Sequence, residues 1–311
     1  MNCDRSVPEV RFVEAAGVRL RAVGEGRGRP VLVLHGFTGD AESMEGVSAA
    51  LRARHRVVRL ELVGHGESDA PREACRYSMS ACSAQILAAR PALGLERPHL
   101  LGYSMGGRAA LAAALASPSD FASLVLVGAT AGIADPAERE ARIASDAALA
   151  DRIEREGVER FVEDWMALPL FASQARLGAA ALARARAQRL RNRAHGLAAS
   201  LRGMGAGAQP PLHARLPGLA LPVLLVVGGE DVKFREIARA LEARLPDARI
   251  RLLPDAGHAA HLEAPEVFAE VVREFLAEVD AAEVDAVESM AAGSMAASQP
   301  TRRGDAARSE S

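Results

Sequence analysis

Lysine and cysteine are nearly absent from this 311-residue sequence, and each absence limits what the chain can be. Lys233 is the only lysine, so arginine supplies almost all the positive charge, and a single arginine is therefore a weak functional signal. The three cysteines, Cys3, Cys75 and Cys82, show no metal-ligand spacing, and their odd number fits a reducing compartment better than a disulfide framework.

An excess of positive charge and a long apolar run are also missing. The sequence contains 38 basic and 40 acidic residues, whereas a nucleic-acid-binding surface needs a strong positive excess. No apolar run approaches the length that spans a bilayer, and the first residues, MNCDRSVPEVRF, contain no apolar signal-peptide core. We therefore expect a cytoplasmic protein that acts without a membrane or a nucleic acid.

Strand-like and helix-like segments alternate along most of the chain. Apolar runs that end in glycine-rich turns are typical of strands buried on both faces. Alanine-rich helical segments, for example 109–115 and 236–244, lie between them. The alternation predicts an α/β fold with a mostly parallel sheet flanked by helices. The predicted strand regions are 10–26 (a hairpin), 30–36, 55–68, 99–104, 123–129, 222–231 and 248–261.

One long helical stretch interrupts this alternation. Residues 132–216 show charged and apolar residues at three- and four-residue spacing, far longer than an ordinary connection. Because parallel sheets bind ligands at the carboxyl ends of their strands, we expect a cap over the site, although a helical excursion without a binding role is the alternative. The cap divides the core into 1–131 and 217–279. Residues 280–311, rich in alanine, serine and acidic residues, are expected to form a disordered tail.

A G-x-S-x-G motif, Gly102-Tyr103-Ser104-Met105-Gly106, lies between a predicted strand and a predicted helix. That context is what a nucleophile elbow requires. The sharp turn forces the serine into strained backbone angles, and side chains at the two glycine positions would clash. A serine that only caps a helix would not need glycine on both sides. We therefore predict that Ser104 is the reactive hydroxyl.

A reactive serine needs a proton acceptor that is itself oriented by a carboxylate. In this type of fold the partners follow in the order Ser, Asp, His. Asp231, in VVGGED, and His258, in LPDAGH, both come directly after a predicted strand. His261 is the competing histidine, but it lies at the start of the last predicted helix. We therefore predict the triad Ser104, Asp231 and His258.

Two other histidines follow predicted strands, and for both we favour a structural role. His35, in LHGF, is expected to fix the following loop, so that the backbone amide of Phe37 joins that of Met105 in an oxyanion hole. His65 has the same position after the next predicted strand, and we expect a structural rather than a catalytic role for it.

The motifs LHGF, GHGES, GYSMGG and GGED resemble the α/β-hydrolase superfamily, over the chain to about residue 276. More narrowly, GYSMGGRAAL, GGEDVKF and AGHAAHLEAPE resemble the 2-succinyl-6-hydroxy-2,4-cyclohexadiene-1-carboxylate synthase (MenH) family. Within the predicted cap, AEREARIASD and FVEDWMALPLF resemble the same family and are more specific. The resemblance implies an α/β-hydrolase fold with a helical cap inserted after the sixth strand.

The resemblance also implies a reaction. Members of this family eliminate pyruvate from 2-succinyl-5-enolpyruvyl-6-hydroxy-3-cyclohexene-1-carboxylate in menaquinone biosynthesis, with the triad acting as a base and with neither cofactor nor metal. The partner would be a small polycarboxylate, and the protein a monomer or a small homo-oligomer. A serine esterase or a carbon–carbon bond hydrolase remains an alternative, as does a ligand receptor without enzymatic activity.

Such a substrate would need fixed cations, for which arginine suits better than lysine. Arg108 follows Ser104 by one helical turn and can reach the same pocket. Each predicted cap arginine is also compatible with a solvated helix face. The substrate-binding residues that the resemblance implies are Tyr103, Arg108, Arg142, Trp165 and Arg191, with Arg189 as the alternative to Arg191.

Overall fold

The computed structural model describes the backbone of residues 7–297 and the side chains of residues 7–285. An eight-stranded sheet with the strand order β1-β2-β4-β3-β5-β6-β7-β8 forms its centre. β1 pairs antiparallel with β2 and β2 pairs antiparallel with β4, whereas the other pairs are parallel. The strands are β1 (Glu9–Ala15), β2 (Val18–Glu25), β3 (Arg29–Leu34), β4 (His55–Leu60), β5 (His99–Tyr103), β6 (Ser123–Val127), β7 (Val223–Gly228) and β8 (Ala248–Leu253).

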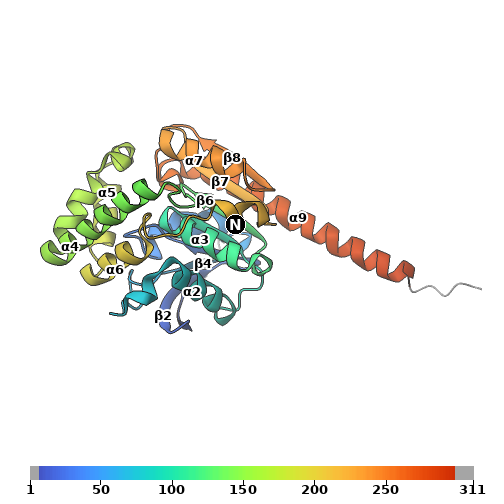
Figure 1. The fold of residues 1–311 in the computed structure, drawn as a ribbon. Coiled ribbons are helices and arrows are strands. Elements are labelled where there is room, and N and C mark those ends of the chain that lie inside the picture. Colours follow the sequence, from blue (N-terminus) through green and yellow to red (C-terminus); the bar gives the residue numbers. More distant parts are fainter. Residues whose placement is uncertain (1–6, 298–311) are drawn as a thin grey trace, which may run out of the picture.

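Helices cover both faces of the sheet, which explains why the central strands are apolar on both sides. Leu32 and Leu34 of β3 point to the face covered by α2, α3 and α7, and Val31 and Val33 point to the face covered by α1 and α9. The sequence-based prediction of a mostly parallel sheet flanked by helices is confirmed (Figure 1). These core helices are α1 (Glu45–Leu51), α2 (Met79–Ala92), α3 (Met105–Ala116), α7 (Val232–Glu242), α8 (Ala260–Glu263) and α9 (Pro265–Ala297).

Three helices between β6 and β7 gather at one end of the molecule (Figure 1). They are α4 (Pro136–Met166), α5 (Ala179–Arg189) and α6 (Ala194–Met204), and we refer to them as the cap. α4 begins at an N-cap aspartate, Asp135, whose side chain accepts a hydrogen bond from the Glu138 amide. Gly157 interrupts α4 with a left-handed φ of 86°. α4 and α6 share a small apolar core, to which Phe37 of the β3 loop also contributes.

The prediction of a disordered tail from Asp280 is wrong for residues 280–297, which continue helix α9. The polar composition was misleading, because Asp280 and Glu283 form ion pairs with Arg29 at the start of β3. Figure 1 shows the rest of α9 projecting away from the sheet. Residues 298–311 of the predicted tail lie outside the described residues. No helix in the described part of the chain has both the length and the hydropathy to cross a bilayer.

Candidate active site

Ser104 lies in the sharp turn between β5 and α3, at φ 51° and ψ −110°. A non-glycine residue rarely adopts this φ, and such strain is typical of functional sites. The flanking glycines allow the turn: a Cβ on Gly102 would lie 2.4 Å from the carbonyl oxygen of Gly106, and one on Gly106 would lie 2.4 Å from that of His35. The predicted elbow geometry is therefore present, and it exposes the hydroxyl at the carboxyl end of the sheet.

Ser104, His258 and Asp231 form one chain of hydrogen bonds. His258 Nε2 lies 3.1 Å from Ser104 Oγ, and His258 Nδ1 lies 2.9 Å from Asp231 Oδ2. Asp231 is also the N-cap of α7, where its other oxygen accepts from the Phe234 amide at 3.2 Å. With Nδ1–H donating to the carboxylate, Nε2 is free to accept the serine proton. The structure thus brings together the three residues that the sequence placed after separate strands.

His261 lies next to this triad but takes no part in it. Its ring stacks on Tyr103 with the centroids 4.5 Å apart, and its Nδ1 has no hydrogen-bond partner among the described residues. Burial lowers the pKa of His261 to about 3, so the ring stays neutral. The choice of His258 over His261 therefore agrees with the geometry.

Aromatic rings surround the imidazole of His258. Phe234 lies 4.5 Å, Tyr103 5.5 Å and Phe171 6.3 Å from it, centroid to centroid. Sequence reasoning missed both phenylalanines. Phe234 could have been found, because it lies three residues after Asp231 in the first turn of the following helix. Phe171 comes from the short helical segment Pro169–Leu177 between α4 and α5, and no local pattern indicates it.

The loop after β3 is held by His35. The Nδ1 of this buried ring donates to the Gly36 carbonyl at 2.8 Å, and its Nε2 accepts from the Leu62 amide at 3.0 Å. Burial lowers the pKa of His35, which keeps Nε2 an acceptor. The structural role predicted for His35 is confirmed. In the turns and loops of the described part of the chain, no hydrogen bond is donated by the Phe37 or Met105 amide, as the predicted oxyanion hole requires.

Arg108 lies on the first turn of α3 with only 9% of its surface exposed. Its Nη1 donates to Gln209 Oε1 at 2.9 Å, and no carboxylate of the described residues lies within ion-pair distance. Burial, followed by the nearby charge of Arg142, lowers the pKa of Arg108 to about 10. A guanidinium that is buried against a neutral amide has unused donors and a strong need for an anion.

The cap arginines differ in what they contact. Arg142 Nε donates to Asp146 Oδ1 at 2.8 Å, and its charge acts on Arg108. Arg191 points to Asp40, with Nη2 2.5 Å from Oδ2, and more than half of its side chain is exposed. Arg189 has no carboxylate partner among the described residues, its Nε is buried without a hydrogen bond, and burial lowers its pKa. Its Nη1 donates to the Ala185 carbonyl of its own helix at 3.0 Å. The alternative weighed from the sequence, Arg189, thus lacks the carboxylate partner that Arg191 has.

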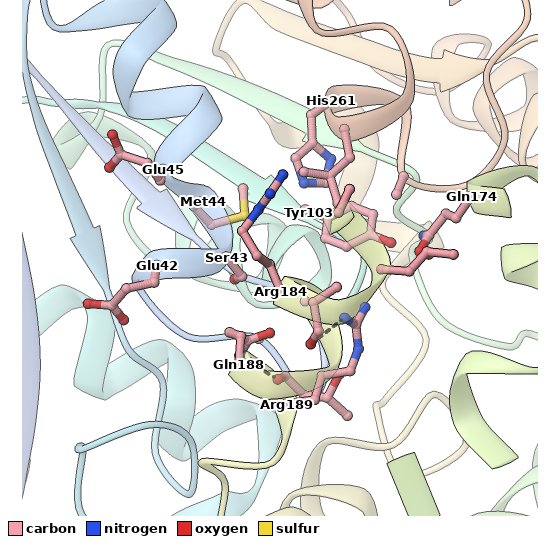
Figure 2. Close-up of a pocket in the computed structure, with 18 of the residues that line it drawn as sticks. Glu42, Ser43, Met44, Glu45, Tyr103, Gln174, Arg184, Gln188, Arg189 and His261 are labelled. Atoms are coloured by element: carbon pink, nitrogen blue, oxygen red, sulfur yellow. Dashed lines mark hydrogen bonds between the residues drawn. The ribbon is translucent and has the colours of Figure 1, made fainter. Parts of the chain in front are cut away.

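Arg189 lines a cavity of about 640 Å³ between the cap and the sheet. Figure 2 shows Tyr103 and His261 facing this cavity from the sheet side, and Gln174 and Arg189 facing it from the cap. Gly36 lies directly beneath the Tyr103 ring, because a Cβ there would lie 2.8 Å from two ring carbons. The predicted wall residue Tyr103, whose ring lies 5.5 Å from that of His258, therefore borders both this cavity and the triad.

Trp165 connects the cap to the loop after β3. Its ring lies 5.2 Å from Phe37 and 5.7 Å from Phe171, centroid to centroid. The indole Nε1 is buried and lacks a hydrogen-bond partner in residues 7–285. A buried N–H of this kind is costly unless a ligand or water accepts from it.

A group of carboxylates near the cavity does not suit a metal ion. Asp40, Glu42 and Glu61 bring their oxygens together, but Arg21 and Arg191 pair with them. The cations neutralise the charge that a metal would need.

Known proteins are similar to this chain in sequence and in fold. The α/β hydrolase fold family matches residues 29–265. A putative 2-succinyl-6-hydroxy-2,4-cyclohexadiene-1-carboxylate synthase of Bacillus subtilis is 40% identical over 87% of this chain and 99% of the relative. The chain belongs to the 2-succinyl-6-hydroxy-2,4-cyclohexadiene-1-carboxylate synthase family of α/β-hydrolases. The synthase of Serratia proteamaculans is 36% identical over 80% of this chain and 93% of the relative.

Two solved structures show how this synthase family relates to other α/β-hydrolases. MenH from S. aureus has a TM-score of 0.78 and 29% identity, covering 87% of this chain and 98% of that structure. A thermophilic esterase from Thermogutta terrifontis has a TM-score of 0.75 and 27% identity, covering 87% of this chain and 99% of that structure. Since a synthase and an esterase match almost equally well, the fold cannot distinguish the two reactions.

Proposed function

We propose that the chain is a 2-succinyl-6-hydroxy-2,4-cyclohexadiene-1-carboxylate synthase. It eliminates pyruvate from 2-succinyl-5-enolpyruvyl-6-hydroxy-3-cyclohexene-1-carboxylate: a ring proton leaves, the bond to the enolpyruvyl oxygen breaks, and the enolpyruvate released becomes pyruvate. No water is consumed. The observation that carries this proposal is Arg108, whose buried guanidinium has only Gln209 as a partner in the described residues. An esterase for neutral substrates has no use for such a group.

In this reaction the triad is a base rather than a route to an acyl-enzyme. Ser104 Oγ and His258 Nε2 lie 3.1 Å apart, so a proton taken from the ring by the serine oxygen passes to the imidazole. The imidazolium that forms is stabilised by Asp231, 2.9 Å away. The enolate oxygen that develops meets the free amides of Phe37 and Met105.

Substrate carboxylates are held by a set of arginines on both sides of the site. Arg108 provides the first cation, from α3. Arg142 lies close enough to lower the pKa of Arg108 and provides a second cation from α4. Arg142 also pairs with Asp146, so a substrate carboxylate competes with that side chain for it. We assign the third position to Arg189 rather than Arg191, because Arg189 has no carboxylate partner among the described residues, whereas Arg191 pairs with Asp40 and Glu42. Arg108, which also has no carboxylate partner in that part of the chain, gains most from a polyanionic ligand. Tyr103 and Trp165 complete the walls.

The remaining features of the proposal follow from the chemistry. A proton abstraction by a serine–histidine pair requires neither cofactor nor metal, and the partner is a small polycarboxylate rather than a nucleic acid or a membrane. We place the enzyme in the cytoplasm, as a monomer or a small homo-oligomer.

The experiment is to incubate the purified full-length protein with the enolpyruvyl substrate and to measure pyruvate release. A serine esterase is the second candidate, because the T. terrifontis esterase has nearly the same fold. Stoichiometric pyruvate together with the cyclohexadiene product supports the synthase. Efficient turnover of small neutral esters without pyruvate release would overturn it.

A further inference from the structure

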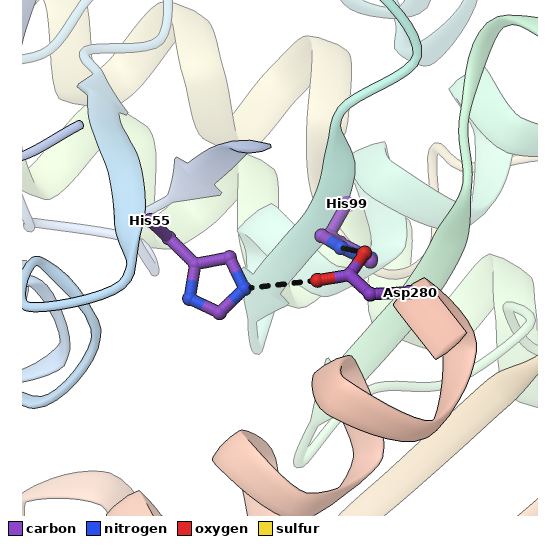
Figure 3. Close-up of side chains that lie close together, drawn as sticks. All are labelled: His55, His99 and Asp280. Atoms are coloured by element: carbon purple, nitrogen blue, oxygen red, sulfur yellow. Dashed lines mark hydrogen bonds and ion pairs between the residues drawn. The ribbon is translucent and has the colours of Figure 1, made fainter. Parts of the chain in front are cut away.

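Two histidines and one aspartate meet at the end of the sheet opposite the active site. His55 and His99 are the first residues of β4 and β5, and Asp280 reaches them from α9 (Figure 3). His99 is separated from Ser104 by the whole length of β5, which at about 3.3 Å per residue is roughly 16 Å. The cluster therefore belongs to no part of the reaction site.

The donor atoms are close enough for one metal ion. His99 Nε2 lies 3.1 Å from Asp280 Oδ1, and His55 Nε2 lies 3.4 Å from Asp280 Oδ2. One ligand atom from each of the three residues lies within 4.8 Å of the others. Bonds of about 2.0–2.1 Å to a tetrahedral zinc ion place its ligand atoms roughly 3.4 Å apart. Shifts of an ångström or less would thus bring the three donors onto one ion.

The surroundings of one of the two rings match those of metal-bound histidines. His99 Nδ1 lies 2.8 Å from Ser123 Oγ, and such a partner on the far nitrogen fixes the ring with Nε2 directed at the carboxylate. His55 Nδ1 is buried and has no hydrogen-bond partner in the described part of the chain, so this ring is oriented by its Nε2 contact alone. His99 is fully buried, whereas 31% of the Asp280 side chain is exposed, which leaves a side open to solvent.

Charges around the cluster also have to be compatible with a cation. Arg29 Nη1 lies 2.8 Å from Asp280 Oδ1 and thereby opposes a metal, but Glu283 pairs with the same guanidinium. Arg97 Nη2 also contacts Glu283, at 3.1 Å. Asp280 Oδ2 is free of arginine and faces His55. With Oδ1 held by Arg29, Oδ2 is the oxygen available for coordination.

We propose that His55, His99 and Asp280 form a divalent metal site of the zinc type, which attaches α9 to the amino-terminal ends of β4 and β5. Two imidazoles and one carboxylate, with water in the fourth position, are a donor set that such ions accept. The ion joins three segments that are distant in sequence, so its role is to hold the carboxyl-terminal helix on the sheet.

The test uses the full-length protein after removal of metal with a chelator, titrated with Co²⁺ and, separately, with Zn²⁺. We expect one equivalent to bind, with the visible d–d absorption of four-coordinate Co²⁺ and a higher Tm with Zn²⁺. Asp280→Asn keeps the shape of the side chain but removes its charge. Loss of a residue that only hydrogen-bonds to a metal ligand weakens metal binding by about 10- to 100-fold, and loss of the ligand itself should weaken it at least as much. Ser123→Ala, which removes the partner of His99 Nδ1, should weaken binding within that range.

Two control variants show whether the ion is at this site. His258→Gln removes the active-site histidine, and His195→Gln removes a partly exposed cap histidine; both should bind one equivalent like the wild type. The proposal is overturned if the wild type shows neither Co²⁺ absorption nor a Tm rise, or if Asp280→Asn binds as tightly as the wild type. In that case the cluster is a metal-free set of hydrogen bonds between the helix and the sheet. Since pyruvate release is not the readout, the outcome is independent of the proposed function.

Discussion

Replacing Arg108 with lysine tests the substrate class most directly, because it keeps the charge and removes the planar group. Arg108 is 9% exposed, and its guanidinium uses one donor on Gln209, at 2.9 Å, which leaves its other donors for a carboxylate. An ammonium is a point charge and cannot hold Gln209 and both oxygens of a carboxylate in one plane. We expect the loss of one charged hydrogen bond, about 1.5–3 kcal/mol. At about 1.36 kcal/mol per factor of ten, kcat/KM falls roughly 10- to 150-fold.

The assay compares pyruvate release with the hydrolysis of a small neutral ester, if any is detectable, in wild type and variant. Only pyruvate release should fall, because a neutral ester places no carboxylate on Arg108. Arg202→Lys is a matched control: this exposed cap arginine pairs with Asp151 and Glu154, and surface pairs contribute little. It should leave both rates nearly unchanged. Equal losses of both activities in Arg108→Lys, with the Tm also reduced, would refute the reasoning and make Arg108 a structural residue.

The Arg108→Lys variant also has an expected pH dependence. Burial lowers the pKa of Arg108 to about 10, and the same burial must lower the pKa of a lysine from a smaller starting value. The lysine is charged below its pKa and neutral above it. The deficit in kcat/KM should therefore grow as the pH rises, and a deficit that is constant with pH would mean that charge is not the cause.

Three further changes have expected outcomes. Ser104→Ala and His258→Ala should each lower kcat by a factor of ~10³ or more, and the double variant should be little worse than either single variant. Additive losses would show that the two residues do not act as a unit. Arg189→Gln should lower kcat/KM for pyruvate release about tenfold or more and Arg191→Gln much less; the reverse order would return the third cation position to Arg191. Burial raises the pKa of Asp280, but the hydrogen bonds with His55 and His99 outweigh this effect and hold the pKa well below its usual range. The stabilising contribution of the Asp280 carboxylate is therefore present above about pH 4 and is lost as the pH falls further. In chemical unfolding with a chelator present, Asp280→Asn should therefore be less stable than wild type at neutral pH. The difference in the free energy of unfolding should close below about pH 4, and a difference independent of pH would contradict this ionic role.

The sequence alone determined the sheet and the order of the triad. Apolar strands buried on both faces have a local signature, and the glycines on both sides of Ser104 mark the sharp turn. Gly102 is required by a local contact with Gly106, whereas Gly106 is required by the carbonyl oxygen of the distant His35. Asp231 and His258 each follow a strand directly. Because carboxyl ends of parallel strands meet at one edge, position along the chain was enough to bring these side chains together.

Tertiary structure decided which arginines lack a carboxylate partner among the described residues and that residues 280–297 are helical. Arg189 is the last residue of α5 and Arg191 lies in the turn after it, so helical spacing does not decide where the two side chains point, and only the position of Asp40 shows which is neutralised. Gln209, the partner of Arg108, is 101 residues distant, and no local pattern indicates it. Residues 280–297 have the composition of a disordered tail, yet they continue α9, and Asp280 at their start contacts three strands of the sheet. Composition reports how much apolar surface a segment can bury, whereas ion pairs with distant residues depend on the fold.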